Sequence, residues 1–278
     1  MNLFSDIEPF MLRAFAVAVV MGPLCALLGV FVTARRMAFF SDTIAHGALA
    51  GIGLGFLLGF EDPTWPMVLF SLLVAAAILW LKEHTELLTD TIMALLLSGS
   101  VAFGIIVLSM LKNKRGELHR YLFGDILSVG PDDVWLAVVL CGAIGMWLFA
   151  KLSPLALLTA SEDLAHVCGV RTRWLNYAFE IVLTVVVSLS IRLLGIILVT
   201  SLVVIPPAAA RNLARNLRQQ IILSLIIGLF GGAAGTVASY HWDIPCGPAI
   251  VMACIAVFIV TLVIGKFRGR KEILTAAK

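Results

Sequence analysis

Long apolar segments alternate with short polar loops along almost the whole chain. A transmembrane helix needs about 20 predominantly apolar residues, and nine segments approach or reach that length. They lie near residues 10–32, 37–60, 65–81, 91–111, 134–150, 175–191, 193–210, 220–240 and 247–265. The sixth and seventh segments are joined so tightly, around Ile191–Leu194, that one of them is expected to be short or re-entrant. The pattern predicts an all-α, polytopic membrane protein with eight or nine transmembrane helices.

The composition agrees with a fold that lies mostly in lipid. Of the 278 residues, 61% are hydrophobic and 13% are charged, whereas a soluble domain is typically about 45–50% apolar and about 25% charged. Residues 1–278 therefore form a single predicted transmembrane domain with a basic tail, 266–278. The first nine residues lack Lys and Arg, so the first apolar segment is expected to stay as a span. The five cysteines form no CxxC pair and are interpreted as ordinary small residues.

The positions of Lys and Arg predict the orientation of the chain. If the N-terminus lies outside and nine segments alternate, the inner loops and tail hold fourteen of the twenty Lys and Arg residues. Membrane proteins carry such an excess on the cytoplasmic side. The basic stretch 112–120 is an exception, because it falls in a predicted outer loop.

The second apolar segment contains an acid and an imidazole at membrane depth. In FFSDTIAHGALAG, residues 39–51, Asp42 precedes His46 by four positions. If the helix begins at Met37, His46 lies about 14 Å along its axis, near the middle of a hydrocarbon core about 30 Å thick. A charge at that depth costs about 3 kcal/mol on insertion scales. The pair therefore needs a compensating interaction.

Two interpretations fit this pair. Positions i and i+4 share a helix face, so an Asp42–His46 hydrogen bond can pack two helices. Alternatively, because carboxylate and imidazole are both ligands of divalent cations, the pair can be half of an intramembrane metal site completed from elsewhere. The next residues Gly47, Gly51 and Gly55 form a ridge at four-residue spacing, which predicts close packing against another helix.

A polar stretch on the predicted inner side, 161–174, is a candidate contact for a soluble partner. A short amphipathic helix closed by glycine is expected from Glu162, Asp163, Leu164, Ala165 and Gly169. The stretch is either a solvated loop or, because it has apolar residues to bury, a segment covered by a partner at the membrane face.

Two prolines and an outer loop are further candidates. Pro206 and Pro207 adjoin inside the seventh apolar segment and are expected to break the helix, either as a kink lining a pathway or as a plain helix end. His241 and Asp243 lie in a predicted outer loop, where they form either ordinary turn chemistry or a cation entry site. Glu180 is an intramembrane acid near a predicted helix end, where it can reach the headgroups. The other histidines fall in loops and are expected to be solvated: His84, His119 and His166.

Several catalytic motifs are absent from the sequence. No GxxxxGK[ST] phosphate loop occurs, so the chain is not expected to bind and hydrolyse ATP by that route. No HExxH motif occurs, and no Ser, His and Asp order stands out for a hydrolase. These absences favour a transport or assembly protein over an enzyme.

Six ordered blocks resemble the metal-cation family of ATP-binding-cassette permeases, the membrane subunits of bacterial zinc and manganese importers. The blocks are RRMAFFSDTIAHGALAG, DTIMALLLSGSVAFGIIVLS, YLFGDIL, EDLAHVCGV, LGIILVTSLVVIPPAAAR and SYHWDIPCGPAIV. They extend from about residue 10 to residue 265. Any one block alone is unspecific, but six in this order are specific.

The resemblance implies roles for some of these residues. Asp42 and His46 match the pair that coordinates the cation in the pathway, and 161–170 matches the segment that docks into the ATPase. Asp243 matches the family's acidic position in the outer block, whereas His241 and Glu180 match no family motif.

The resemblance also implies partners. It implies two ATPase subunits that use ATP, a solute-binding protein that delivers metal from outside, and a second copy of the permease in the bacterial cytoplasmic (inner) membrane. Zn²⁺ or Mn²⁺ is the expected cargo, with no permanently bound cofactor and no nucleic acid. The overall resemblance favours zinc, with manganese and iron as alternatives.

Two other function classes remain open on the residues alone. A proton-coupled secondary transporter could use Asp42, His46 and Glu180 as a relay. In a structural or assembly membrane protein, the Asp42–His46 pair would only pack helices.

Overall fold

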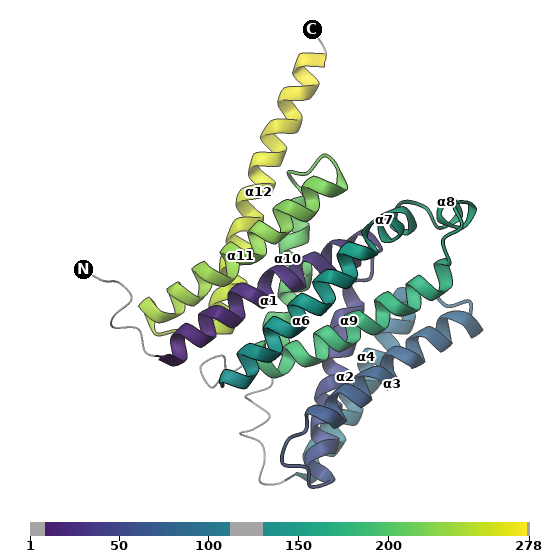
Figure 1. Ribbon diagram of the computed structural model, residues 1–278, viewed down its shortest axis with the longest axis vertical. Helices are drawn as coiled ribbons and strands as arrows, with labels where there is room; N and C mark the ends of the chain where they lie inside the picture. Colours follow the sequence, from purple (N-terminus) through teal and green to yellow (C-terminus); the bar gives the residue numbers. More distant parts are fainter. Residues whose placement is uncertain (1–8, 112–129, 277–278) are drawn as a thin grey trace.

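The computed structural model describes residues 9–111 and 130–276, and every regular element among them is a helix (Figure 1). The helices are α1 (Pro9–Ala34), α2 (Ala38–Leu57), α3 (Thr64–His84), α4 (Thr89–Met110), α6 (Pro131–Ala150), α7 (Leu152–Ala160), α8 (Glu162–Val167), α9 (Thr172–Leu194), α10 (Ile196–Arg211), α11 (Leu217–Trp242) and α12 (Cys246–Ala276). The predicted all-α fold is confirmed. The basic stretch 112–120 and the block YLFGDIL, 121–127, lie outside the described residues.

Eight helices of the described part are long and apolar enough to cross a membrane, namely α1, α2, α3, α4, α6, α9, α11 and α12. The apolar helix α10 has only 16 residues, or about 24 Å at 1.5 Å per residue, against a hydrocarbon core of about 30 Å. Gly195, with φ of +80°, separates it from α9. The prediction of eight or nine spans, with a short member in the sixth and seventh pair, is confirmed.

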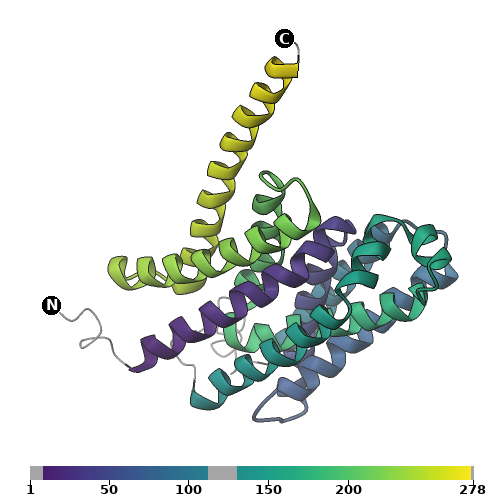
Figure 2. The ribbon, with the colours of Figure 1, turned by 45° about the horizontal axis from the view of Figure 1, so that its top comes forward.

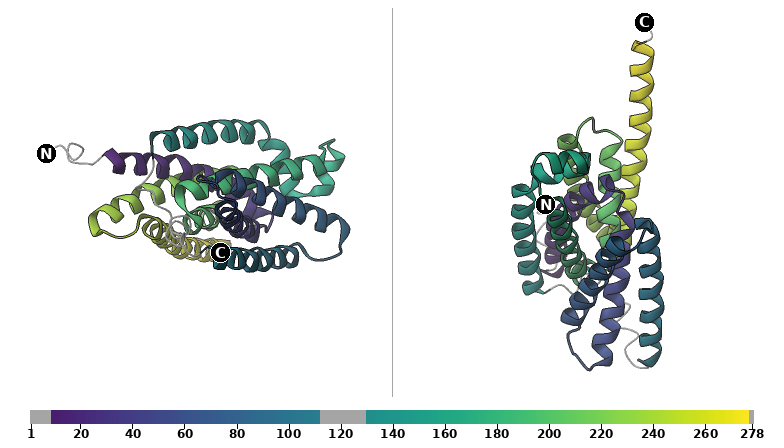
Figure 3. Two further views of the ribbon diagram at one scale, coloured as in Figure 1. Left: turned by 90° about the horizontal axis from the view of Figure 1, so that it is seen from below. Right: turned by 90° about the vertical axis from the view of Figure 1, so that its right-hand side faces the viewer.

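The helices pack in two groups that share α9 and α10. In one group α1 lies against α10 and α11, and α12 packs on α10 and α11. In the other group α2 lies between α3 and α4, and α3 also packs against α9 (Figures 1 and 2). The helices α7 and α8 lie together at one end of the bundle, and the far part of α12 projects beyond the other helices (Figure 3). The core is formed mainly by α1, α2, α9 and α10.

Of the two alternatives for Pro206 and Pro207, a plain helix end at the prolines is wrong, whereas a kink stays a prediction. Helix α10 runs through both buried prolines and ends at Arg211. Pro207 has no N–H for the Val203 carbonyl, and the backbone of α1 covers that carbonyl instead. A Cβ built on Gly29 would collide with the Val203 oxygen and lie 2.7 Å from Pro207 Cγ. The backbone of α1 therefore packs directly against α10 at the two prolines.

At the end of the bundle opposite α7 and α8, one arginine links several elements. Arg192 in the last turn of α9 donates to Asp62 Oδ2 at 3.1 Å and to Thr64 Oγ1 at 2.9 Å, and lies 3.5 Å from Asp133 Oδ1 of α6. Partial burial raises the pKa of Asp62, but hydrogen bonds from Thr64 and the charge of Arg192 outweigh it, so the pKa lies below its ordinary value of 3.8. This charge cluster joins the α2–α3 loop to α6 and α9.

We expect Gly29→Ala to separate α1 from α10, because the added methyl meets backbone rather than a flexible side chain. The melting temperature of the purified protein should fall by at least about 4 °C, the shift that 1–2 kcal/mol causes in a protein of this size. The matched control is Gly99→Ala in α4, where a Cβ meets nothing within 4 Å. Equal melting temperatures for the two variants would show that the close contact contributes nothing.

Acidification should weaken the cluster around Arg192. Because the pKa of Asp62 is lowered in the folded protein, its stabilising effect is present at neutral pH and is lost as the pH falls below about 3.8. The thermal stability of Asp62→Asn should therefore depend less on pH between about 6 and 3 than that of the wild type. Asp132→Asn, an exposed carboxyl in the first turn of α6, should keep the wild-type dependence. Identical pH profiles for all three proteins would refute the role of Asp62.

Candidate metal site

Helix α2 places Asp42 and His46 on its least buried face. Between Ala38 and Gly53 the positions that are not fully buried are Ala38, Phe39, Asp42, His46 and Leu49. Their spacing of three or four residues puts them on one side of the helix. The other sides pack against α3, α4, α9 and α10. The carboxylate and the imidazole are thus half-buried on the face of α2 that its own chain covers least.

On another face of α2, small residues let neighbouring segments pack close to the helix backbone. A Cβ on Gly51 would lie 2.8 Å from the Pro66 carbonyl oxygen, and one on Gly55 would lie 2.9 Å from Pro63 Cβ. A Cβ on Gly47 would lie 3.1 Å from Val74 Cγ2. The three glycines therefore face the loop before α3 and α3 itself, so α3 packs on a different side of α2 from the Asp42–His46 pair.

The two polar side chains have no partner within the described ranges. Asp42 and His46 make no hydrogen bond or ion pair there, with each other or with another residue. The neighbouring hydroxyl of Thr43, by contrast, donates to the carbonyls of Phe39 and Met93 at 2.8 and 3.2 Å. The Asp42–His46 hydrogen bond of the packing interpretation is therefore not formed in this structure.

The pair offers two ligand atoms of different chemistry but no complete coordination shell. In residues 9–111 and 130–276, no group of three or more His, Cys, Asp or Glu side chains is close enough to hold a metal ion. Zinc sites in proteins are mostly four-coordinate. A cation held by Asp42 and His46 thus needs further donors from water, from another chain or from residues outside the described part.

The outer-loop candidates lie in a helix-ending turn. Asp243 is the residue that ends α11, in the left-handed region with φ of +52°, and both His241 and Asp243 are exposed. The Ser239 hydroxyl donates to the Ile244 carbonyl at 2.6 Å, and the Ile244 N–H donates to the Ser239 carbonyl at 3.2 Å. Asp tolerates this backbone conformation better than most residues. The local geometry is that of an ordinary turn, open to solvent.

Glu180 does not extend toward the surface, contrary to the sequence-based expectation. It is 4% exposed, and Lys82 Nζ of α3 lies 2.8 Å from its Oε1. Nearby, Arg35 in the α1–α2 turn donates to Asn176 and Thr159. These pairs join residues about a hundred positions or more apart, so the order of residues alone gave no signal for them.

Helix α8 has the predicted shape. It spans Glu162–Val167, the Ser161 hydroxyl accepts the Leu164 N–H at 3.3 Å, and Gly169 follows with φ of +78°. Ala165 is buried, whereas Leu164 and Val167 are 51% and 84% exposed. Glu162 and Asp163 are also exposed. The helix therefore presents apolar and acidic side chains together at one end of the bundle.

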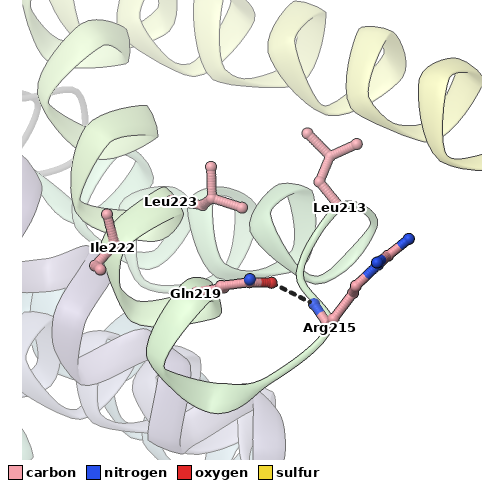
Figure 4. A pocket seen from close by; sticks show the side chains of 5 residues that line it. All are labelled: Leu213, Arg215, Gln219, Ile222 and Leu223. Atoms are coloured by element: carbon pink, nitrogen blue, oxygen red, sulfur yellow. Dashed lines mark hydrogen bonds between the residues drawn. The ribbon is translucent and has the colours of Figure 1, made fainter.

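A mostly apolar hollow lies at the α10–α11 connection (Figure 4). It is lined by Leu213, Arg215, Gln219, Ile222 and Leu223. The Gln219 side-chain oxygen accepts the Arg215 N–H at 3.0 Å and so fixes the loop that forms one wall. No lining residue comes from α2, so this hollow is separate from the Asp42–His46 pair.

The chain is similar to known proteins, both in sequence and in the arrangement of its helices, over most of its length. It is 29% identical over 265 residues to the high-affinity zinc uptake system membrane protein ZnuB of Haemophilus influenzae, which covers 94% of this chain and 98% of that protein. It is 28% identical over 256 residues to the manganese import system permease protein ScaB of Streptococcus gordonii, with 92% and 91% covered. A chain in the solved structure of PsaBC from Streptococcus pneumoniae in complex with Fab is 28% identical, with a TM-score of 0.80 and 91% of each chain covered.

The family model extends from the first helix into the last. It matches residues 7–265, from just before α1 to most of α12, and so includes α2 with the Asp42–His46 pair and the exposed helix α8. The match covers most of the chain, and the relatives named above are matched over nearly their entire lengths. The chain belongs to the ABC 3 transport family.

Proposed function

We propose that this protein is the membrane subunit of an ATP-driven importer of divalent metal ions, with zinc as the main cargo. The observation that carries the proposal is the Asp42–His46 pair, half-buried, without a partner in the described part, and directed to the least covered face of a buried helix. Family membership and relatives named for zinc and manganese uptake support it. The residues act by binding and releasing a cation, so the chain itself is not an enzyme.

The cation is held between one carboxylate oxygen and one ring nitrogen. It enters from the outer face of the membrane, near the α11–α12 turn with His241 and Asp243, and loses water before it reaches Asp42 and His46. The imidazole binds metal through a neutral ring nitrogen. Carboxylate and imidazole suit both zinc and manganese, which makes manganese, and then iron, the alternative cargo.

The rest of the coordination shell comes from a second copy of the chain. A two-fold axis beside the open face of α2 would bring two Asp42–His46 pairs together and supply four donors, the number that zinc prefers. The less buried stripe with Phe39 and Leu49, on either side of the pair, is then the surface that faces the partner copy. The permease accordingly works as a homodimer.

Helix α8 is the contact for the ATPase. The chain has no phosphate-binding loop of its own, so ATP is hydrolysed in a separate subunit, one for each permease copy. The exposed apolar side chains Leu164 and Val167, beside Glu162 and Asp163, give that subunit a mixed apolar and acidic surface. Docking at α8 requires this end of the bundle to lie in the cytoplasm, with the N-terminus and a metal-delivering solute-binding protein outside a bacterial cytoplasmic membrane.

The geometry weighs against a proton-coupled secondary transporter. Such a transporter needs a third titratable group that exchanges protons, and Glu180 was the candidate. Its Oε1 lies 2.8 Å from Lys82 Nζ of α3, so the carboxylate is engaged in an ion pair between α3 and α9. Glu180 therefore serves the structure of this end of the bundle.

Removing either metal ligand should abolish uptake without unfolding the protein. In proteoliposomes that contain the permease, its ATPase and the binding protein, Asp42→Asn and His46→Gln should each lower ⁶⁵Zn²⁺ uptake by at least about tenfold, since even groups that merely support a metal ligand are worth that much. Asp132→Asn, an exposed carboxyl in α6, is the matched control and should transport like the wild type. Wild-type uptake by both site variants in assembled complexes would refute the site.

Competition between metals should identify the cargo. In the same proteoliposomes with the cognate binding protein, excess unlabelled Zn²⁺ should suppress ⁵⁴Mn²⁺ uptake, whereas the same excess of Mn²⁺ should leave most ⁶⁵Zn²⁺ uptake intact. The reverse pattern would assign the importer to manganese and overturn the preference for zinc. The ATP dependence of uptake is measured in parallel, and uptake driven by a proton gradient without ATP would contradict the importer.

A further inference from the structure

A single arginine links the start of the metal-binding helix to the region of α8. Arg35 lies in the turn between α1 and α2. Its Nε donates to Thr159 Oγ1 of α7 at 3.3 Å, and its Nη1 donates to Asn176 Oδ1 of α9 at 3.0 Å. The guanidinium carbon also lies 4.8 Å from the centre of the Phe179 ring. One side chain in the α1–α2 turn thus contacts two other elements of the bundle, α7 and α9.

The surroundings of Arg35 are apolar and acidic. Phe179 packs edge-on against Phe31 of α1, with ring centres 6.1 Å apart. Burial lowers the pKa of Arg35, whereas the charges of Glu180 in α9 and Glu162 in α8 raise it, so both carboxylates attract the guanidinium. Within the described part, Arg35 Nη2 and Glu180 Oε2 are both buried without a hydrogen-bond partner. An unused donor and an unused acceptor are therefore present in the same region.

The position of Arg35 in the chain places it between the junction of α7 with α8 on one side and the start of α2 on the other. Thr159 is two residues before Ser161, the residue that caps α8. On the other side, Arg36 takes a left-handed conformation with φ of +57°, and α2 begins at Ala38. Asp42 follows after one turn of that helix. A shift of α8 therefore reaches the metal-binding face through α7, the guanidinium and the first turn of α2.

We propose that Arg35 is a positioning residue that transmits movement of α8 to the Asp42–His46 face of α2. The inference rests on the proposed function, since it assigns Arg35 to the coupling between ATPase and metal site. The guanidinium is planar, and its donors point in fixed directions, so it follows Thr159 and Asn176 as a rigid fork when α7 moves against α9. Where the movement of α7 is large enough to break the Thr159 bond, Glu180 Oε2 is the buried, unused acceptor that the guanidinium can pair with instead.

A role in packing alone predicts a different result from a role in coupling. A packing residue affects folding, and its loss lowers ATP hydrolysis, metal binding and transport together. A coupling residue affects how much metal moves for each ATP hydrolysed. The ratio of uptake to hydrolysis in one preparation therefore separates the two roles.

The test uses the complete importer in proteoliposomes with ⁶⁵Zn²⁺. Arg35→Lys keeps the charge but lacks the fork, and Thr159→Val keeps the shape but lacks the acceptor hydroxyl. In both variants zinc taken up per ATP hydrolysed should fall by about fivefold or more, the lower end of typical coupling between sites. The rate of ATP hydrolysis and the zinc affinity of the permease, measured by equilibrium binding, should stay close to wild type. The control is Arg36→Gln, the exposed neighbour, which should keep wild-type coupling.

Two results would overturn the inference. One is an unchanged ratio of uptake to hydrolysis in Arg35→Lys and Thr159→Val, and the other is a parallel fall of binding, hydrolysis and uptake. Where Arg35→Lys fails to assemble, Thr159→Val decides alone, because it changes a single hydroxyl. These results differ from a failure of the proposed function, in which the wild-type complex itself takes up no metal with ATP.

Discussion

The cost of placing a carboxylate and an imidazole inside a membrane is the constraint on which this structure depends. Hydrocarbon gives such groups no hydrogen-bond partners, and in the described part the chain itself gives Asp42 and His46 none. Ionisable residues inside a membrane are by default candidates for a functional site. In the proposed importer, a divalent cation shared between two copies of the chain would compensate both groups at once and make this part of α2 a binding site.

The packing around α2 shows how the fold keeps this pair accessible. Gly51 and Gly55 let α3 and the loop before it approach the helix backbone, and α4 covers another side. At the end of the bundle that holds α7 and α8, Arg35 and the Lys82–Glu180 pair tie the turns together. At the opposite end Arg192 does the same. A helix fixed at both ends and covered on its other faces holds Asp42 and His46 in one direction.

The lengths of the apolar segments were enough to predict the membrane helices and the short α10, and the polar stretch closed by glycine predicted α8, because these depend on neighbouring residues. The spacing of Asp42 and His46 also predicted their shared face. The close packing of α1 on α10 at Pro206 and Pro207 could not be predicted, because it involves Gly29, which is distant in sequence and lies against Val203. The burial of Glu180 depends in the same way on Lys82 in another helix. One sequence does not say which helices are neighbours, so contacts between distant segments require the fold.

The location of the bound ion tests the central claim most directly. Zn²⁺ is added to the complete importer, and its position is determined from anomalous scattering at the zinc edge, with X-ray absorption to identify the ligand atoms. The account predicts zinc bound to a carboxylate oxygen of Asp42 and a ring nitrogen of His46, with the same two atoms of the second copy completing the shell. Zinc bound elsewhere along the pathway, with Asp42 and His46 directed away from it, would contradict the account.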